Sequence, residues 1–208
     1  DHIAYIKGYP DGGVHPTANI TRAEVSAIFY RLLSDDARKQ YAATSSSFAD
    51  ANKSWAAAEI ATLTNAGILK GYTDGSFRPN AAITRAEFAS IAARFDKLSG
   101  GNKTFSDVPS NHWAYAAITS AAEKGWVNGY SDGTFRPSNA ITRSEVVKIT
   151  NAVLGRSCDK DYVAKNISKL TSYNDLSNTY WAYYDILEAS NAHDYKTASG
   201  VESWTGLK

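Results

Sequence analysis

Residues 71–87 read GYTDGSFRPNAAITRAE, and the same pattern, with the same internal spacing, stands at residues 8–24 and 129–145. Each copy opens on Gly-Tyr, continues through an Asp-Gly turn and a Pro, and closes on Ile-Thr-Arg-Ala/Ser-Glu. Internal repeats of this kind indicate a structure built from several similar units. One unit of this size buries too little apolar surface to fold alone, so we expect the three to form one cooperative domain.

A second, shorter pattern alternates with the first. Its copies are Phe48-Ala49-Asp50 with Trp55, Phe105-Ser106-Asp107 with Trp113, and Tyr173-Asn174-Asp175 with Trp181. The last copy has no Gly-Tyr loop after it, and the first Gly-Tyr loop has no Trp copy before it. We therefore expect the C-terminal Trp segment, around residues 175–192, to pack beside the N-terminal loop and to close a pseudo-threefold ring.

Both patterns predict helices. Apolar residues recur three and four positions apart after each Thr-Arg-Ala/Ser-Glu motif and again after each Trp, which indicates one buried helical face. The Gly-Tyr-x-Asp-Gly stretch has the composition of a turn. The sequence thus predicts an all-α domain over residues 1–195, followed by a C-terminal tail over residues 196–208. We expect loop–helix units at about 5–44, 68–100 and 126–156, and Trp-helix units at about 45–67, 102–125 and 172–193.

The Thr-Arg-Ala/Ser-Glu motif predicts a capped helix N-terminus. A Thr at the N-cap and a Glu three residues later satisfy the first amide groups of a helix. The Arg between them needs another cause, because a cation in the first turn faces the positive end of the helix dipole. It either pairs with an Asp of its own loop or of a neighbouring Trp-helix, or it forms an anion site for a carboxylate or phosphate. The residues concerned are the caps Thr21, Thr84, Thr142, Glu24, Glu87 and Glu145, the arginines Arg22, Arg85 and Arg143, and the aspartates Asp11, Asp74, Asp132, Asp50, Asp107 and Asp175.

The aromatic and glycine residues near these motifs have two interpretations each. The Tyr and Trp rings either pack in the core, which is our first expectation for the Trp, or offer flat faces to a sugar. The glycines either permit a turn with positive φ or let a ligand approach the backbone. The residues concerned are Tyr9, Tyr72, Tyr130, Trp55, Trp113, Trp181, Gly8, Gly12, Gly71, Gly75, Gly129 and Gly133.

Composition excludes several classes of function. The chain has 208 residues with 22 Lys and Arg against 21 Asp and Glu, a net charge of +1. This lacks the basic excess of a nucleic-acid binder, and no apolar run is long enough to insert in a membrane. The lone Cys158 cannot form an internal disulfide. We read it as a free thiol without a role.

Catalysis and metal binding are not predicted. A glycosidase needs two carboxylates at a set separation, but the repeated Glu are committed as caps. The four His, at positions 2, 15, 112 and 193, occupy unrelated places in the repeat, so no triad or metal cluster is expected and no cofactor either. The loop at Asp74 resembles an EF-hand start, but Ser76, Arg78 and Arg85 stand at positions three, five and twelve, where calcium needs oxygen ligands.

Taken together, the motifs over roughly residues 5–195 resemble S-layer homology domains. These are triplet modules that attach surface-layer proteins and exoenzymes to cell walls of the Gram-positive type. The resemblance implies a pseudo-threefold spindle of three helix–loop–helix repeats around a central helical bundle, with grooves between the repeats. It also implies a partner, a peptidoglycan-linked secondary cell-wall polymer that often ends in a pyruvate-ketal N-acetylmannosamine.

The resemblance assigns roles to residues as well. It implies that Arg22, Arg85 and Arg143 receive the ketal carboxylate and that the Gly and Asp residues of the three loops line the grooves. The first copy departs from the others, with Val14 and His15 in place of Phe-Arg. We expect Arg85→Ala or Arg143→Ala to weaken glycan binding far more than it destabilises the fold.

The sequence thus favours a non-catalytic, secreted anchoring module at the cell surface, in the cell wall or S-layer. Self-assembly would use regions of the parent protein outside this segment. The alternative is a protein–protein assembly module of a surface layer, which would tolerate loss of the motif arginines.

Overall fold

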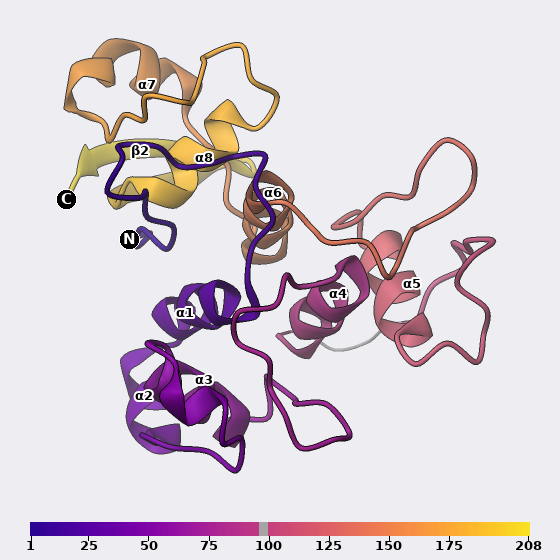
Figure 1. Ribbon diagram of the computed structural model, residues 1–208. Coiled ribbons are helices and arrows are strands. Elements are labelled where there is room, and N and C mark those ends of the chain that lie inside the picture. The colour runs from indigo at the N-terminus through magenta and orange to yellow at the C-terminus, as the bar shows by residue number, and fades with distance from the viewer. Residues whose placement is uncertain (96–99) are drawn as a thin grey trace. The chain divides into compact units, whose positions relative to one another are not determined.

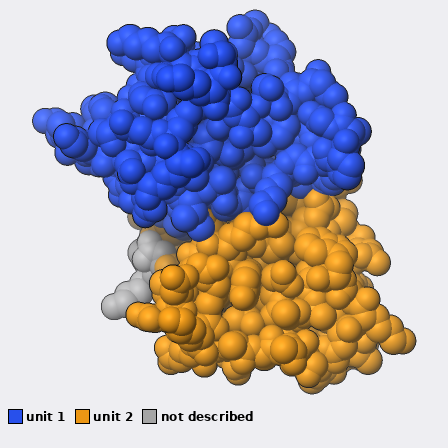
Figure 2. Space-filling view, turned by 90° about the vertical axis from the view of Figure 1, so that its left-hand side faces the viewer, with its two compact units in different colours: residues 1–18, 142–208 blue, residues 19–141 orange. Residues whose placement is uncertain are grey.

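The structure is a computed structural model that describes residues 1–95 and 100–208, and helices predominate in it (Figure 1). The described chain divides into two compact units (Figure 2). Unit 1 comprises residues 1–18 and 142–208, and unit 2 comprises residues 19–141. In the part of the chain that the structure covers, no helix has the length and apolar character that crossing a bilayer requires.

The helices of the loop–helix units begin where the capping boxes predict. They are α1 (Arg22–Leu32) and α4 (Arg85–Arg94) in unit 2 and α6 (Arg143–Leu154) in unit 1. In each, the Thr hydroxyl accepts a hydrogen bond from the Glu amide, and the Glu carboxylate accepts one from the Thr amide. The structural role of the three Thr–Glu pairs is therefore confirmed. The last residues of the predicted 68–100 unit, 96–99, lie outside the described residues.

The Trp segments form the partner helices. These are α3 (Ala57–Asn65) and α5 (Tyr115–Glu123) in unit 2 and α8 (Tyr183–Ser190) in unit 1. α3 packs against α1, α5 against α4, and α8 against α6. The repeat pattern did not predict four short elements, which are α2 (Asp35–Tyr41), η1 (Ala51–Lys53), α7 (Lys160–Asn166) and η2 (Ile167–Lys169).

Backbone hydrogen bonds link three equivalent Ile residues of unit 2 in a closed cycle. The amide of Ile83 donates to the carbonyl of Ile20 at 2.9 Å, that of Ile141 to Ile83 at 3.1 Å, and that of Ile20 to Ile141 at 3.4 Å. All three side chains are buried. Equivalent residues of the three repeats therefore meet around one point.

In unit 1, the C-terminal Trp segment contacts the N-terminal loop. The amides of Val14 and His15 donate to the two carboxylate oxygens of Asp175, at 2.8 and 2.9 Å. The side-chain amide of Asn174 donates to the carbonyl of Asp11 at 2.7 Å. This confirms the expected pairing of the last Trp segment with the first loop.

The C-terminal residues correct the prediction of a tail. β1 (His193–Ala198) and β2 (Val201–Leu207) form an antiparallel hairpin beside α8, which the all-α expectation did not include (Figure 1). Glu202 and Trp204 alternate with exposed neighbours along β2 and are buried. Trp204 packs in an apolar cluster with Val163, Leu170 and Leu187. The hairpin is thus part of the core of unit 1.

The hairpin also holds the N-terminal segment, because His2 forms a β-bridge with His193. His2, His193, Glu188 and Glu202 are buried together there, each at most 8% exposed. This corrects the expectation of unrelated histidines, since the bridge joins residues at the two ends of the chain. Burial, and then the charge of Glu202, raise the pKa of Glu188 to about 8. Burial, and then the charge of Arg156, lower the pKa of His2 to about 3.

Candidate functional site

The second Gly-Tyr loop holds a cation over its own Tyr ring. The guanidinium of Arg78 lies 3.9 Å from the ring centroid of Tyr72, and its Nη2 is 3.0 Å from Oδ2 of Asp74. The other oxygen of Asp74 accepts hydrogen bonds from the hydroxyl and the amide of Ser76. These bonds, the Ser76 hydroxyl first, lower the pKa of Asp74 to about 2. The loop therefore presents a fixed, solvent-accessible cation backed by an aromatic ring.

An Asp from the preceding Trp segment fixes the loop backbone. Arg78 has a φ of +57°, an uncommon conformation for a residue with a side chain. The carboxylate of Asp50 accepts hydrogen bonds from the amides of Phe77 (3.0 Å) and Arg78 (2.7 Å). Burial by itself would raise the pKa of Asp50, but these amides outweigh it and keep the pKa below 3.8. Asp107 binds the amides of Phe135 and Arg136 in the same way.

The helix-start arginine reaches the loop of the next repeat. Arg22 donates from Nε to the carbonyl of Phe77 (2.8 Å), from Nη2 to the carbonyl of Lys70 (3.0 Å), and from Nη1 to the carboxylate of Glu87. Its guanidinium also lies 4.7 Å from the ring centroid of Tyr72. Arg22 is only 6% exposed, so it joins α1 to the second loop from within.

The other two helix-start arginines repeat the two carbonyl contacts and are also buried. In unit 2, Arg85 donates to the carbonyls of Phe135 and Asn128, and in unit 1, Arg143 donates to those of Val14 and Lys7. Each helix-start arginine thus donates to two backbone carbonyls at a Gly-Tyr loop of another repeat, which are partners that the sequence did not suggest.

A pocket of about 830 Å³ opens beside Arg22 in unit 2. Its walls come from the second loop, from α4, and from the start of α5 with the preceding Trp113. Its charged lining is four basic residues and one carboxylate, and His112 and Tyr72 also line it. The charged residues are Arg22, Lys70, Arg78, Arg94 and Glu87. Burial, and then the charge of Arg22, lower the pKa of Arg94. The basic excess suits an anionic ligand, although the whole chain is nearly neutral.

The three Trp correct the expectation of core packing. Trp55, Trp113 and Trp181 are 64%, 66% and 55% exposed. They precede α3, α5 and α8, and the buried faces of these helices begin only at Ile60, Ala117 and Ile186. Of the three, Trp113 lines the pocket. An exposed indole beside a basic pocket offers a flat face to a sugar ring.

The loop glycines have structural causes. A Cβ on Gly71 would lie 2.2 Å from the ring of Phe48, and one on Gly129 would lie 2.3 Å from Phe105. A Cβ on Gly8 would meet Tyr173 at 2.6 Å. The second glycine of each loop has positive φ, as in Gly75 at +84°. Turn geometry and ring packing explain these residues without a ligand.

Sequence reasoning missed several residues of the pocket. Arg78 and its equivalent Arg136 were not predicted as site residues, although two of the three copies share the Phe-Arg-Pro sequence. Glu87 was assigned only to the capping box, yet it also accepts hydrogen bonds from Arg22 and from the Tyr72 hydroxyl. Arg94 and Lys70 lie outside the repeated motifs, so no pattern marked them.

Comparison with known proteins agrees with the repeats. The family of S-layer homology domains matches residues 4–26, 47–89 and 104–147. Cell surface glycoprotein 1 of Acetivibrio thermocellus is 40% identical over the whole chain, and the cellulosome-anchoring protein of the same organism is 37% identical over 94% of it. S-layer protein EA1 of Bacillus anthracis is 30% identical over 69% of it. The chain spans 9%, 44% and 17% of the lengths of these relatives. It belongs to the S-layer homology domain family.

Proposed function

We propose that this chain is a non-catalytic module that anchors a larger protein to the cell wall at the cell surface. The observation that carries the proposal is the unit 2 pocket, in which Arg78 and the exposed Trp113 accompany a basic lining. Two of the relatives are named as a cellulosome-anchoring protein and an S-layer protein, which supports the same role. The repeated Glu residues serve as helix caps, which supports the absence of a catalytic carboxylate pair.

The ligand that this lining fits is an anionic glycan. We propose a secondary cell-wall polymer whose terminal sugar carries a carboxylate, with the pyruvate ketal of N-acetylmannosamine as the first choice. Arg78 has the planar donor geometry that pairs with a carboxylate, and its side chain is 50% exposed. Trp113 provides an adjacent ring face for the sugar, and the volume of about 830 Å³ is in the range of small-molecule sites.

Arg22 is buried beside this site and mainly supports it rather than contacting the ligand. Three of the five N–H groups of a guanidinium are directed to Phe77, Lys70 and Glu87, which leaves one on each terminal nitrogen for a ligand. We therefore assign the first carboxylate contact to Arg78. Arg22 adds positive charge and holds Glu87 against the Tyr72 hydroxyl.

Equivalent sites would lie at the other two loops. The third loop places Arg136 3.7 Å from the ring centroid of Tyr130, as Arg78 lies over Tyr72. The pseudo-threefold spindle of the repeats stays a prediction, and the cyclic hydrogen bonds of Ile20, Ile83 and Ile141 support it. Several sites engaged along one polymer would raise the overall affinity by roughly 10²–10⁴ over a single site.

The proposal is tested by calorimetric titration with a pyruvate-ketal N-acetylmannosamine glycoside and with the same sugar lacking the ketal. We expect binding of the ketal sugar alone, with fewer sites per chain in Arg78→Ala. Arg38→Ala is the matched control, because Arg38 is also a surface arginine paired with an Asp. Its titration should match that of the unaltered chain.

Two outcomes would reject parts of this proposal. Equal binding of the two sugars would reject the carboxylate as the recognised group. If neither sugar nor isolated cell walls bind, while the chain associates with a surface-layer protein regardless of Arg78, the assembly-module alternative is correct.

A further inference from the structure

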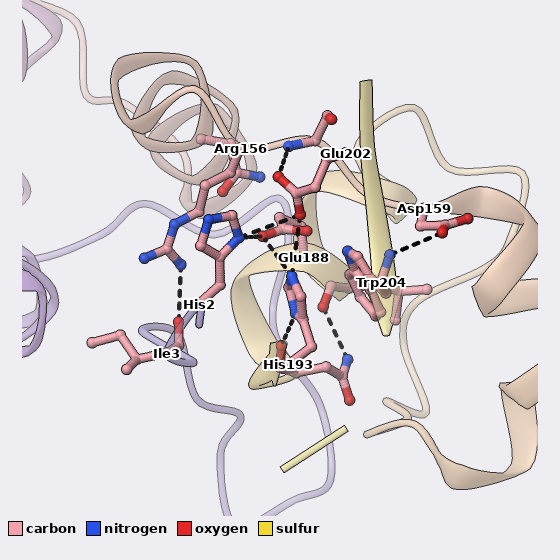
Figure 3. Close-up of polar contacts among 12 residues, drawn as sticks. His2, Ile3, Arg156, Asp159, Glu188, His193, Glu202 and Trp204 are labelled. Atoms are coloured by element: carbon pink, nitrogen blue, oxygen red, sulfur yellow. Dashed lines mark hydrogen bonds and ion pairs between the residues drawn. The ribbon is translucent and has the colours of Figure 1, made fainter. Parts of the chain in front are cut away.

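Four buried side chains in unit 1 converge from four places in the chain. His2 comes from the N-terminal segment, Glu188 from α8, His193 from β1 and Glu202 from β2 (Figure 3). One ligand atom from each can be chosen so that all four lie within 4.8 Å of one another. None of the four residues in this cluster belongs to a Gly-Tyr loop or lines the pocket, so the proposed anchoring function does not use them.

The distances match those around a tetrahedral metal ion. Nδ1 of His2 lies 3.0 Å from Oε1 of Glu188 and 3.3 Å from Oε1 of Glu202. Nε2 of His193 lies 3.5 and 3.2 Å from the same two oxygens. Zinc ligands at about 2.1 Å in a tetrahedron are separated by about 3.4 Å. Four of the six edges of such a tetrahedron are therefore present.

The hydrogen bonding of His193 explains why a cation is needed there. Nδ1 of His193 is 2.8 Å from the carbonyl oxygen of Asn191, which can only accept. The proton of a neutral His193 is therefore on Nδ1, and its Nε2 lone pair faces the carboxylate oxygens of Glu188 and Glu202. Three acceptors directed at one point require a proton or a metal ion between them.

The surroundings of the cluster hold its members in place. The amide of Ser157 donates to Oε2 of Glu202 at 3.3 Å. The ring of His193 stacks on Trp204 at 3.8 Å, and the ring of His2 lies 4.0 Å from that of Tyr195. A backbone carbonyl behind a histidine and a donor behind a carboxylate are the outer contacts that metal sites use.

Of the four residues, Glu188 lacks a full set of hydrogen-bond partners. It is fully buried, and its Oε2 makes no hydrogen bond in the structure. The indole N–H of Trp204 is near Glu188 but also makes no hydrogen bond of regular geometry. A buried carboxylate without a full set of partners is costly, and a cation at the centre of the cluster would offset that cost.

We propose that His2, Glu188, His193 and Glu202 form a closed structural site for a divalent transition-metal ion, Zn²⁺ first. Two carboxylates balance its charge, and four protein ligands leave no open position, as in structural rather than catalytic zinc sites. Two imidazole ligands disfavour Ca²⁺ and Mg²⁺, which prefer oxygen. The ion would join the N-terminal segment to α8 and the hairpin and so stabilise unit 1.

The test uses the whole chain without an affinity tag, treated with a chelator and then dialysed. We expect it to take up one Zn²⁺ per chain by elemental analysis, with a rise in melting temperature as Zn²⁺ is added. Co²⁺ in its place should give the strong visible absorption of a tetrahedral site. His193→Ala should lower the zinc affinity at least about 100-fold and abolish the rise.

Two further kinds of variant keep the test decisive. Glu202→Gln preserves the shape of the side chain and its bond from Ser157, so it carries the test if His193→Ala does not fold. His15→Ala and His112→Ala remove the histidines outside the cluster and should leave uptake unchanged. Less than about 0.1 Zn²⁺ per chain in excess metal, without a rise in melting temperature, would show that shared protons hold the cluster together and would overturn the proposal.

Discussion

The guanidinium groups of Arg22 and Arg78 lie over the same Tyr72 ring, but the first is buried and the second is exposed. Arg22 starts α1, is 6% exposed, and is bonded to two carbonyls and Glu87. Arg78 is on the loop, its side chain is 50% exposed, and its partner is the exposed Asp74. The cation inside the helix start holds the repeats together, whereas the cation on the loop is available to a ligand. Loss of stability and loss of binding should therefore separate between these two positions.

The largest effect is expected from Arg22→Ala. It removes three hydrogen bonds and leaves the mostly buried carboxylate of Glu87 without its cation, so we expect a loss of about 3 kcal/mol in the free energy of unfolding. Urea denaturation measures it, with Arg38→Ala as a control that should stay within about 0.5 kcal/mol. If Arg22→Ala lowers the free energy of unfolding by less than about 1 kcal/mol, Arg22 contributes no more to stability than an exposed arginine does.

The same reasoning revises an expectation from the sequence. Arg85 and Arg143 are as buried as Arg22 and also donate to loop carbonyls. Their replacement by Ala should therefore destabilise the fold as well as weaken binding. The variant that isolates binding is Arg78→Ala.

The next largest effect is expected from Asp50→Ala, which frees the backbone beneath Arg78. The carboxylate bonds to the amides of Phe77 and Arg78, and bonds to a charged group are the stronger kind, so we expect a loss of about 1.5 kcal/mol in the free energy of unfolding. Asp50→Asn should lose less, because it keeps an acceptor. Asp74→Ala is the control on the exposed side of the loop and should change stability little.

Acid unfolding provides a second measurement of the hydrogen bonds between the Asp50 carboxylate and the loop amides. The folded-state pKa of Asp50 is lowered from its ordinary value of 3.8, so its stabilising contribution is present above that ordinary value and is lost as the pH falls through the folded-state value. Unfolding free energies between pH 5 and pH 2 should therefore fall less steeply for Asp50→Ala than for the unaltered chain. If the two plots of unfolding free energy against pH run parallel, the Asp50 carboxylate does not stabilise the loop.

The capping boxes and the repeat order were predictable because they depend on residues close in sequence. Thr21 and Glu24 are three residues apart, and a single helical turn determines their contact. The carbonyl partners of Arg22 were not predictable, because carbonyls carry no sequence signal and the contact with Phe77 spans 55 residues. The meeting of His2 with Glu188 spans 186 residues and depends on a hairpin whose strands are short and largely polar.

Trp113 should affect binding but not folding. Its side chain is 66% exposed, so Trp113→Ala should change the free energy of unfolding by no more than about 0.5 kcal/mol. A ring stacked on a sugar contributes about 1 kcal/mol, so we expect about fivefold weaker binding at the unit 2 pocket by calorimetry. Trp113→Phe keeps an aromatic ring, so its binding affinity should lie between that of Trp113→Ala and that of the unaltered chain. Unchanged affinity in Trp113→Ala would remove the indole from the site.

The smallest effect is expected from making the first loop like the second. His15 has a φ of +51°, stacks on Tyr9 at 4.0 Å, and lies 2.6 Å from Asp11. Arg78 has the same backbone conformation, ring and Asp neighbour, with a φ of +57°. A guanidinium offers a planar fork of donors that matches a carboxylate, and an imidazole lacks this fork. The first loop should therefore hold a carboxylate less well than the second.

His15→Arg should consequently tighten glycan binding by about threefold, because a guanidinium can pair with a carboxylate through two parallel hydrogen bonds. The reciprocal variant, Arg78→His, should weaken binding at the second loop by a similar factor and keep its fold. Calorimetric titrations compare both variants with the unaltered chain. If His15→Arg binds the glycan no more tightly than the unaltered chain, the residue over the Tyr ring does not bind the anion, and the first contact belongs to the helix-start arginines after all.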